Sequence, residues 1–461
     1  MIHPRSQRLD LMRLPFVRRL VRARPFQWTL TTVTLFFFVL AILAGLLGTP
    51  VGNSNFAIIF VWIVWWALVI VLLVPFGGRL WCTMCPIPMP GEWLQRRAFI
   101  GRRPGRLFTL GRRWPRRLRN IWLQNATFLG VALFSAILLT RPKATGVVLL
   151  GFVLLAIALS LVYERRTFCR YVCPVGGFIG LYSTAAPLEL RVRDPEVCRG
   201  HTEKACYLGN EQGYGCPWLV FPATLDRNTY CGLCTECLKT CTLDNIALNL
   251  RPPGTDLLAP ARGRLDEAYK GFIMLATALL YSALFLGPWG WLKDSANLTS
   301  VGGYLAFVGA FLAINLLVLP GLFFGCAWLA RRLGGLAVPV RQVFTRYAYT
   351  LVPMGLLAWI AFSLAFVFAN GSYVIAVASD PFGWGWNLFG TRDVAWQPML
   401  VGVVPFLQTA LLLGGLVAAI GLAYRLGRQQ GADHAGALRA ALPISTFLTA
   451  VTLVFLRLFV G

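Results

Sequence analysis

The sequence predicts a polytopic α-helical membrane protein with an inserted polar module rich in cysteine. Three observations support this fold class. The 461 residues are 57% hydrophobic and 13% charged, whereas soluble domains carry about a quarter charged residues. Several apolar stretches reach the roughly 20 residues that a membrane-spanning helix needs. Seven of the twelve cysteines fall in one polar interval between such stretches.

Nine apolar stretches are predicted to cross a membrane. They cover residues 29–49, 56–76, 121–140, 144–163, 270–289, 302–327, 348–369, 398–424 and 442–460. Lys and Arg gather in alternate connections, within the intervals 5–24, 79–119, 165–264, 331–346 and 425–439. The positive-inside rule places these connections in the cytosol. We therefore expect a cytosolic N-terminus, an outside C-terminus and a location in the bacterial cytoplasmic (inner) membrane.

The formal charge of +25 follows mostly from this topology. The basic residues flank the predicted spans, which favours contact with anionic membrane lipid, and we expect no nucleic-acid partner. The three histidines are His3, His201 and His434, and none lies inside a predicted span. Because a haem within a membrane needs axial ligands inside the spans, we expect no bound haem.

Apolar and polar intervals divide the chain into four predicted parts. These are a basic cytosolic segment (1–28), a four-helix membrane core of two hairpins (29–184), a cytosolic module (185–262) and a five-helix membrane domain (263–461). The stretch from Leu9 to Val21 has two interpretations, an amphipathic helix on the membrane surface or a solvated basic tail. The stretch from Leu188 to Arg193 alternates in the manner of a strand.

The two hairpins of the membrane core form an internal repeat. The first ends in Cys82-x2-Cys85 and the second in Cys169-x3-Cys173, each followed by proline and preceded by Arg, one residue and an aromatic. Pseudo-symmetry would bring the two cysteine pairs face to face. A shared metal site, a redox dithiol and a structural role stay open. A redox or metal role is favoured, because neighbouring arginines stabilise thiolates.

The run Cys231-x2-Cys234-x2-Cys237-x3-Cys241 has the spacing of a bacterial ferredoxin motif. Three thiolates of such a run bind one 4Fe-4S cluster, and the fourth binds a second cluster. A four-cysteine zinc site also uses Cys-x2-Cys pairs, but the third and fourth cysteines fit a cluster better. Thr242 stands where a proline usually follows such a run.

Further ligand candidates lie upstream of the run, so that two 4Fe-4S clusters are expected. The predicted ligands of cluster one are Cys216, Cys231, Cys234 and Cys237. Those of cluster two are Cys198, Cys206, Cys241 and, as an open alternative, His201. Imidazole in place of thiolate raises the reduction potential. Without a fourth protein ligand the second cluster would be a three-iron form or would bind water.

Together these motifs resemble the membrane-bound polyferredoxins. That group includes the quinol-oxidising membrane subunit of periplasmic nitrate reductase systems and the C-terminal half of the nitrous-oxide reductase regulator. The resemblance covers about residues 29–250 and rests on the two Cys-Pro hairpins and the run from Cys231 to Cys241. It implies electron transfer between the quinone pool and a partner enzyme. The two-residue gap in the first hairpin departs from the pattern, and the five C-terminal spans lie outside it.

The sequence therefore favours an electron-transfer subunit over a stand-alone enzyme, since no nucleotide loop, paired carboxylates or catalytic triad is evident. The expected partners are membrane lipid, quinone or quinol, and a peripheral or soluble redox protein. The alternative is a maturation or sensing protein that uses the same cysteines to reduce a metal or report redox state. Asn315 and Gln408 lie inside predicted spans, where they contact either a quinone or a neighbouring helix.

Overall fold

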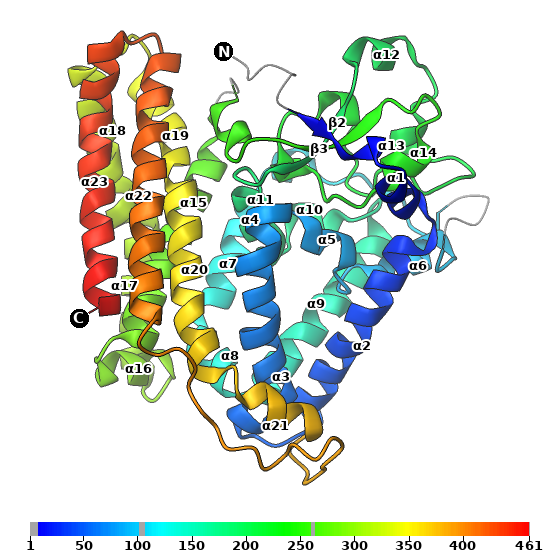
Figure 1. Cartoon of the computed structure of the whole chain (residues 1–461), viewed down its shortest axis with the longest axis vertical. Coiled ribbons are helices and arrows are strands. Elements are labelled where there is room, and N and C mark those ends of the chain that lie inside the picture. The colour runs from blue at the N-terminus through cyan, green and yellow to red at the C-terminus, as the bar shows by residue number, and fades with distance from the viewer. Residues whose placement is uncertain (1–7, 101–106, 260–262, 461) are drawn as a thin grey trace. The chain divides into compact units, whose positions relative to one another are not determined.

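The computed structural model describes residues 8–100, 107–259 and 263–460. The chain is mostly helical and divides into two compact units, whose helices and strands are drawn in Figure 1. Unit 1 consists of Met1–Leu43, Leu72–Gln124 and Gly146–Ala259, and unit 2 of Ala44–Val71, Asn125–Thr145 and Pro260–Gly461. His3 and the predicted boundary at residue 262 lie outside the described residues. The predicted divisions at residues 28, 184 and 262 stay predictions.

Eight helices in the described part of the chain are long and apolar enough to cross a membrane. They are Pro25–Leu47 (α2), Phe56–Gly77, Pro142–Val162 (α9), Leu265–Leu286, Val301–Leu333, Val340–Asn370, Val404–Gln429 (α22) and His434–Val460 (α23). The longer ones contain α15 (Leu265–Tyr281), α17 (Val301–Ala313), α18 (Leu319–Leu333), α19 (Val340–Tyr347) and α20 (Leu351–Asn370). These helices make the chain polytopic and α-helical, as the sequence predicts.

The predicted span at residues 121–140 is interrupted, so it is not among these eight continuous helices. It forms α7 (Trp122–Leu133) and α8 (Ser135–Thr140), and Phe134 between them has φ −94° and ψ 11°. The Tyr281 hydroxyl donates a hydrogen bond of 3.1 Å to the carbonyl of Ala132. In a continuous helix that oxygen accepts the backbone N–H four residues later. A side chain inserted into the hydrogen-bond ladder accounts for such a break.

Polar side chains within the helices of unit 2 bind neighbouring helices. Thr277 of α15 donates a hydrogen bond of 3.2 Å to the fully buried side-chain oxygen of Asn315. Gln408 of α22 donates one of 2.9 Å to the carbonyl of Ala361 in α20. Buried polar groups in apolar surroundings need such partners. Of the two interpretations of Asn315 and Gln408, helix–helix bonding is therefore the one that these contacts favour.

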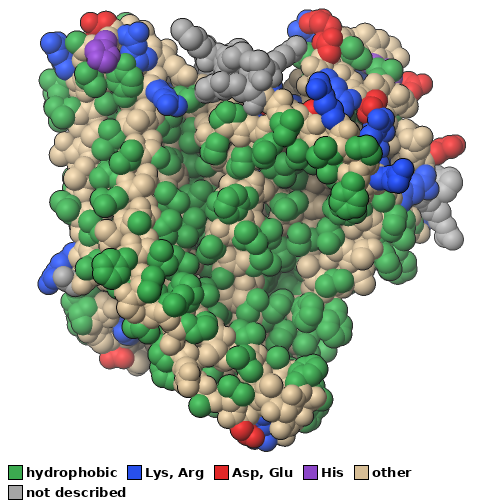
Figure 2. Space-filling view, viewed as in Figure 1, with side chains coloured by type: hydrophobic (Ala, Val, Ile, Leu, Met, Phe, Trp, Pro, Cys, Tyr) green, Lys and Arg blue, Asp and Glu red, His purple; other side chains and the backbone are tan. Residues whose placement is uncertain are grey.

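Large apolar side chains remain exposed along the long helices. Leu317 is 70% exposed, Phe406 76% and Val417 71%. Figure 2 shows many hydrophobic side chains at the surface of the helical parts of the chain. Extended apolar surface is unfavourable in water but matches the acyl chains of a bilayer. The surface therefore agrees with the helix lengths in indicating a membrane protein.

A three-stranded antiparallel sheet in unit 1, with the strand order β1–β3–β2, supports the cysteine-rich part of the chain. β2 (Leu188–Val192) pairs with β3 (Ile246–Leu250), and Leu190 lies opposite Leu248. This strand confirms the prediction made from the alternating pattern. β1 (Leu9–Asp10) adds to the other edge of β3. Every cysteine of the two predicted cluster sets lies between β2 and β3 in sequence.

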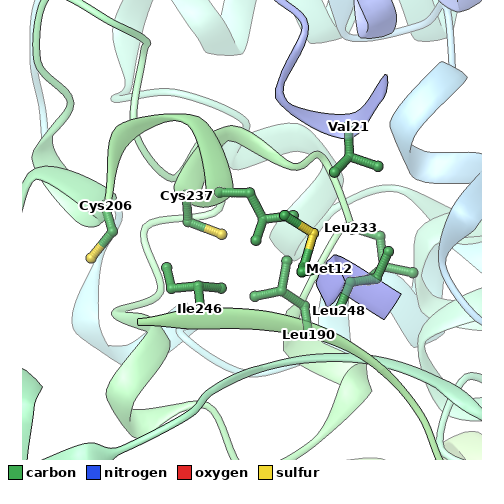
Figure 3. Close-up of a cluster of buried hydrophobic side chains, with 9 residues drawn as sticks. Met12, Val21, Leu190, Cys206, Leu233, Cys237, Ile246 and Leu248 are labelled. Atoms are coloured by element: carbon green, nitrogen blue, oxygen red, sulfur yellow. The ribbon is translucent and has the colours of Figure 1, made fainter. Parts of the chain in front are cut away.

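The N-terminal segment forms a helix that packs on this sheet, which argues against a solvated basic tail. Helix α1 (Pro15–Arg22) buries Val21, and Met12 is only 2% exposed. Arg22 forms an ion pair with Asp244, which follows the cysteine run. Figure 3 shows the resulting apolar cluster, in which Met12 and Val21 lie near Leu190, Cys206, Leu233, Cys237, Ile246 and Leu248. Burial of Met12 and Val21 in this cluster fixes the segment against the protein.

Five short helices of unit 1 each carry one cysteine: α5 (Leu80–Met84), α10 (Thr167–Tyr171), α12 (Pro195–Gly200), α13 (Ala205–Leu208) and α14 (Glu236–Thr240). Two further short helices, α6 (Met89–Arg96) and α11 (Pro174–Tyr182), follow the two Cys-Pro pairs. Cys173 caps the N-terminus of α11, where proline follows at the first helical position. Proline suits that position because its missing N–H would have no partner inside the helix.

Candidate functional site

The four cysteines of the two Cys-Pro hairpins come together in unit 1, and we call them the hairpin group: Cys82, Cys85, Cys169 and Cys173. Burial raises the pKa of Cys85, and so do the charges at Cys173 and Cys82. Burial also raises the pKa of Cys169, to which Cys173, Cys85 and Cys82 contribute. The four thiols thus lie within electrostatic range of one another. Cys173 accepts a hydrogen bond of 3.2 Å from the backbone N–H of Gly176.

Arg166, which precedes the second hairpin pair, is buried beside a carboxylate. It forms an ion pair with Glu92 of α6 and donates a hydrogen bond of 3.1 Å to the carbonyl of Cys82. Burial alone would raise the pKa of Glu92, yet Arg166 and Arg96 hold it below its usual value. A carboxylate that stays ionised keeps the buried guanidinium neutralised. This pair fixes the backbone of the first hairpin against the second.

Arg79 occupies the equivalent position of the first hairpin but has no carboxylate partner among the described residues. It is 2% exposed, binds the carbonyl of Gly176 and lies 4.5 Å from the ring centre of Trp218. Its Nε and Nη1 atoms have no hydrogen-bond partner there. An uncompensated buried cation is costly. A 4Fe-4S group held by four thiolates is anionic, so these orphaned donors fit such a group nearby.

The ferredoxin-like run turns tightly between its cysteines. Leu233 and Thr235 adopt the left-handed backbone conformation, with φ of 49° and 61°. A side chain at Gly232 would place its Cβ 1.9 Å from the indole nitrogen of Trp218, so this close approach requires glycine. The left-handed residues and the close approach at Gly232 orient the segment that carries Cys234 and Cys237.

Cys216 joins three cysteines of the run, and we call this set the run group: Cys216, Cys231, Cys234 and Cys237. Burial raises the pKa of Cys231 to about 11, and the charge at Cys216 adds to the shift. Burial also raises the pKa values of Cys234 and Cys237 well above the ordinary value, again with a contribution from Cys216. The four residues predicted for cluster one are therefore within electrostatic range of one another.

The residues predicted for cluster two line one small cavity, and we call them the outer group: Cys198, His201, Cys206 and Cys241. Burial raises the pKa of Cys206 to about 11, and the charges at Cys241 and Cys198 add to it. The Asn245 amide donates a hydrogen bond of 3.2 Å to the sulfur of Cys198. The half-buried His201 thus shares a cavity with all three thiols.

The three groups follow one another through unit 1. Thr83, between the two cysteines of the first hairpin, donates a hydrogen bond of 2.8 Å to the carbonyl of Leu233 in the run. Arg165 donates one of 2.9 Å to the carbonyl of Cys216. After burial and the nearer thiols, the charge at Cys206 contributes to the raised pKa of Cys237. The run group therefore neighbours both other groups.

All twelve cysteines are free thiols. Over the described ranges, no three His, Cys, Asp or Glu side chains are arranged to hold a single metal ion. Ligands of one ion such as zinc must all converge on that ion. The four thiolates of a cubane bind four different irons and do not require that convergence.

Several residues that hold the site were missed in the sequence. Glu92 and Thr83 make the contacts given above, and the Gln124 amide donates a hydrogen bond of 3.0 Å to the carbonyl of Cys169. None of these three carries a local pattern that indicates its role. Arg79 and Arg166 were visible as part of the repeat, but their burial and unequal partners depend on the fold.

Comparison with known proteins finds one matching domain family and one relative. Residues 58–117 and 145–188 match a family described as a 4Fe-4S binding domain. The methylamine utilization ferredoxin-type protein MauN of Paracoccus denitrificans (strain Pd 1222) is 28% identical over 136 residues, which are 26% of this chain and 45% of that protein. These matches make part of the chain similar to a 4Fe-4S binding domain and to a ferredoxin-type protein, in keeping with the resemblance to polyferredoxins.

The matched domain coincides with one of the three cysteine groups. It contains all four cysteines of the hairpin group and none of the other eight. The chain spans less than half the length of the relative it matches, and no solved structure matches it. A 4Fe-4S binding domain and a ferredoxin-type relative support iron–sulfur electron transfer as the function of the chain.

Proposed function

We propose that this chain is a membrane-anchored electron-transfer protein with three iron–sulfur sites in series. The succession of hairpin, run and outer groups within one compact unit carries the proposal. When bound, a 4Fe-4S cluster supplies a one-electron redox centre. Adjacent groups shorten each electron-transfer step, and the buried thiols keep the centres out of water.

The hairpin group is proposed to hold a cluster because of its coincidence with the matched domain. That domain carries four cysteines, the number that a cubane needs. Arg79 supports the assignment, since its buried and unpaired donors require a nearby negative charge. Among the three chemistries that the sequence left open for these thiols, this choice is a form of the shared metal site.

The run group and the outer group are proposed to hold two further clusters. Cys216, Cys231, Cys234 and Cys237 would complete one site with four thiolates. Cys198, Cys206 and Cys241 would bind the other, with His201 as the fourth ligand, because His201 lines the same cavity. A site with one imidazole is expected to have the higher reduction potential.

Two electron-exchange partners are proposed for the series of three sites. Quinone would meet the hairpin group at one end, and a redox protein would meet the outer group at the other. The hairpin group follows the helices Phe56–Gly77 and α9 within a few residues, which favours contact with a membrane quinone there. Oxidation of quinol to quinone releases two electrons and two protons, and the sites accept the electrons singly. The outer group lies farther along the series and suits a peripheral or soluble redox protein, on the cytosolic side of a bacterial inner membrane.

The cluster content of the purified full-length protein tests the core of this proposal. Three sites of four irons predict about 12 iron atoms per chain, with visible absorption that bleaches on addition of dithionite. The double variant Cys82→Ser/Cys169→Ser should lose about a third of the iron. Cys326→Ser is the control, because Cys326 lies outside the three groups, and should keep it all. Colourless protein that contains zinc would refute the proposal.

The quinone link needs a separate experiment. A menaquinol analogue added anaerobically to membranes that contain the protein should bleach the same absorption. If dithionite bleaches the protein and the quinol does not, the quinone link is wrong while the clusters stand. Reduction of copper by the protein would then be measured, since it would support the maturation alternative.

A further inference from the structure

A cavity in unit 1 has no part in the proposed electron transfer. Its volume is about 290 Å³. Five arginines and one carboxylate line it, namely Arg112, Arg113, Arg119, Arg166, Arg170 and Glu164. They come from two segments, one between α6 and α7 and the other directly after α9. Such an excess of one charge around a concave surface concentrates ions of the opposite charge.

Most of this positive charge is not neutralised by the protein. Arg166 pairs with Glu92, as described above. Arg170 donates a hydrogen bond of 2.6 Å to the carbonyl of Trp218, and Arg119 donates one of 3.2 Å to the carbonyl of Trp114. Across the described residues, no carboxylate pairs with these two or with Arg112 and Arg113. Carbonyl oxygens satisfy donors but leave the cationic charge in place.

An aromatic wall closes one side of the cavity. The rings of Trp114 and Tyr171 stack with centroids 5.3 Å apart and an interplanar angle of 2°, and both residues line the cavity. The wall offers apolar contact beside a cationic rim. The cavity therefore suits a ligand with an anionic head and a small organic part.

We propose that this cavity binds a phosphate ester. A phosphate group carries up to two negative charges and accepts hydrogen bonds on several oxygens, which matches the planar forks of several guanidinium groups. The ester part would lie against Trp114 and Tyr171. Two sources share this chemistry, a phospholipid headgroup and a soluble phosphate ester. The lipid is a candidate because the segment from Glu164 to Tyr171 directly follows the membrane-spanning α9.

The cavity also touches the loops of two cysteine groups. Arg170 and Tyr171 lie between Cys169 and Cys173, and Trp218 follows Cys216 by two residues. A bound anion would therefore disfavour the added negative charge of a reduced cluster and lower its potential. Linkage requires the converse as well, so that reduction weakens anion binding. This redox coupling rests on the proposed function, whereas binding itself does not.

Isothermal titration calorimetry with glycerol 3-phosphate tests the binding. The full-length protein is kept in dodecyl maltoside micelles and phosphate-free buffer. Arg112→Gln/Arg113→Gln should bind the probe at least tenfold more weakly than the wild type, because two charge-assisted contacts are lost. The matched control is Arg116→Gln/Arg117→Gln, which removes the same charge from exposed neighbours outside the cavity. It should bind within about twofold of the wild type.

Competition by lipid distinguishes the two sources. If phosphatidylglycerol in the micelles displaces glycerol 3-phosphate and diacylglycerol does not, the site takes a lipid headgroup. If neither lipid displaces the probe, the site takes a soluble ester. Equal weakening in the two double variants would overturn the proposal. Absence of binding by both glycerol 3-phosphate and phosphatidylglycerol would also overturn it.

A redox titration tests the coupling separately. Saturating glycerol 3-phosphate should lower a midpoint potential of the wild type and leave that of Arg112→Gln/Arg113→Gln unchanged. Binding without any shift would refute the coupling while the site stands. Absence of clusters would refute the proposed function, and the calorimetric result would be unaffected.

Discussion

At the scale of single residues, two equivalent arginines of the repeat have become different. Arg166 is neutralised by Glu92, whereas Arg79 is buried with two unpaired nitrogen donors. Arg79 counteracts the burial that raises the pKa values of Cys82, Cys173 and Cys231. Its charge therefore reaches both the hairpin group and the run group. We expect Arg79 to adjust the reduction potentials of the clusters proposed for them.

The substitution Arg79→Gln should lower the midpoint potential of the nearest cluster. Reduction adds negative charge, which a neighbouring cation stabilises, so loss of the cation disfavours reduction. The effect should be on the order of 1–2 kcal/mol, or roughly 40–90 mV for one electron. A redox titration followed by electron paramagnetic resonance measures it. Arg117→Gln, at an exposed position, is the control, and equal potentials in both variants would contradict this role.

His201 is the residue on which the proposed outer site depends. In His201→Cys a thiolate would replace an imidazole, which adds negative charge to the cluster. The potential of the outer cluster should therefore fall, by on the order of 100 mV. The matched control is His434→Cys, because His434 is exposed and bonds to Tyr424 in unit 2. An unchanged potential in the His201 variant would show that this side chain is not a ligand.

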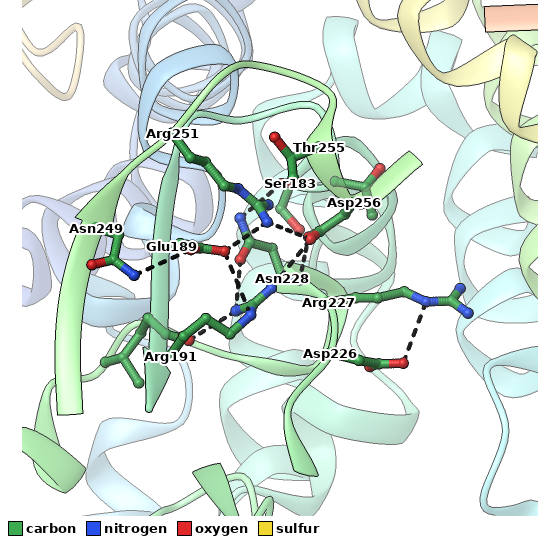
Figure 4. Close-up of polar contacts among 12 residues, drawn as sticks. Ser183, Glu189, Arg191, Asp226, Arg227, Asn228, Asn249, Arg251, Thr255 and Asp256 are labelled. Carbon is green, nitrogen blue, oxygen red and sulfur yellow. Dashed lines mark hydrogen bonds and ion pairs between the residues drawn. The ribbon is translucent and has the colours of Figure 1, made fainter. Parts of the chain in front are cut away.

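At the scale of elements, a buried polar network fixes the sheet against the run. Figure 4 shows Arg191 of β2 and Arg251 after β3 between the carboxylates of Glu189 and Asp256. Asp256 also accepts a hydrogen bond of 2.7 Å from the backbone N–H of Asn228. The carbonyl of Asn228 in turn accepts the N–H of Cys231. The network thus positions the first cysteine of the run.

The substitution Asp256→Ala should destabilise this part of the chain strongly. Both Arg191 and Arg251 would lose a partner while buried, and removal of one member of such a pair costs about 3–5 kcal/mol. Thermal unfolding of the purified protein measures the change. Asp226→Ala is the matched control, because Asp226 is 57% exposed and lies 3.8 Å from Arg227. An exposed pair contributes at most about 1 kcal/mol, so equal losses would contradict the importance of the network.

At the scale of the whole molecule, the predicted topology depends on the interrupted helix pair. Arg166 follows α9 and contacts the carbonyl of Cys82, which follows the helix Phe56–Gly77. We therefore expect the ends of these two helices to lie on the same side of the membrane. If α9 crosses in one direction, the chain between them would cross in the other. The apolar pair α7 and α8 is the segment available for that crossing, and nine passes therefore stay our prediction.

Epitope tags test this topology. With nine passes, a tag at the N-terminus and a tag inserted after Gly390 should lie on opposite sides of the membrane. With eight passes they would lie on the same side. Antibody accessibility in right-side-out vesicles measures this, and a tag after Gly431 is expected on the same side as the N-terminus. Accessibility of the N-terminal tag and the Gly390 tag from one side would refute nine passes.

The sequence by itself determined most of what is local in this protein. Apolar length and basic flanks predicted eight of the helices, because helix length must match bilayer thickness whatever the neighbours are. Cysteine spacing indicated the run from Cys231 to Cys241, since a short run constrains the reach of its thiols, and the ligand sets built on it stay predictions. Alternation predicted β2 for a similar local reason.

Only the tertiary structure decided the features that depend on distant partners. Tyr281 interrupts the helix at Ala132 from about 150 residues away in sequence. Met12 and Val21 are buried in the apolar cluster of the sheet and the run, a contact that their basic surroundings did not indicate. The pairing of Arg166 with Glu92, and the lack of such a partner for Arg79, likewise have no local signal. Burial and charge compensation are set by which segments meet in space, and spacing along the chain does not record that.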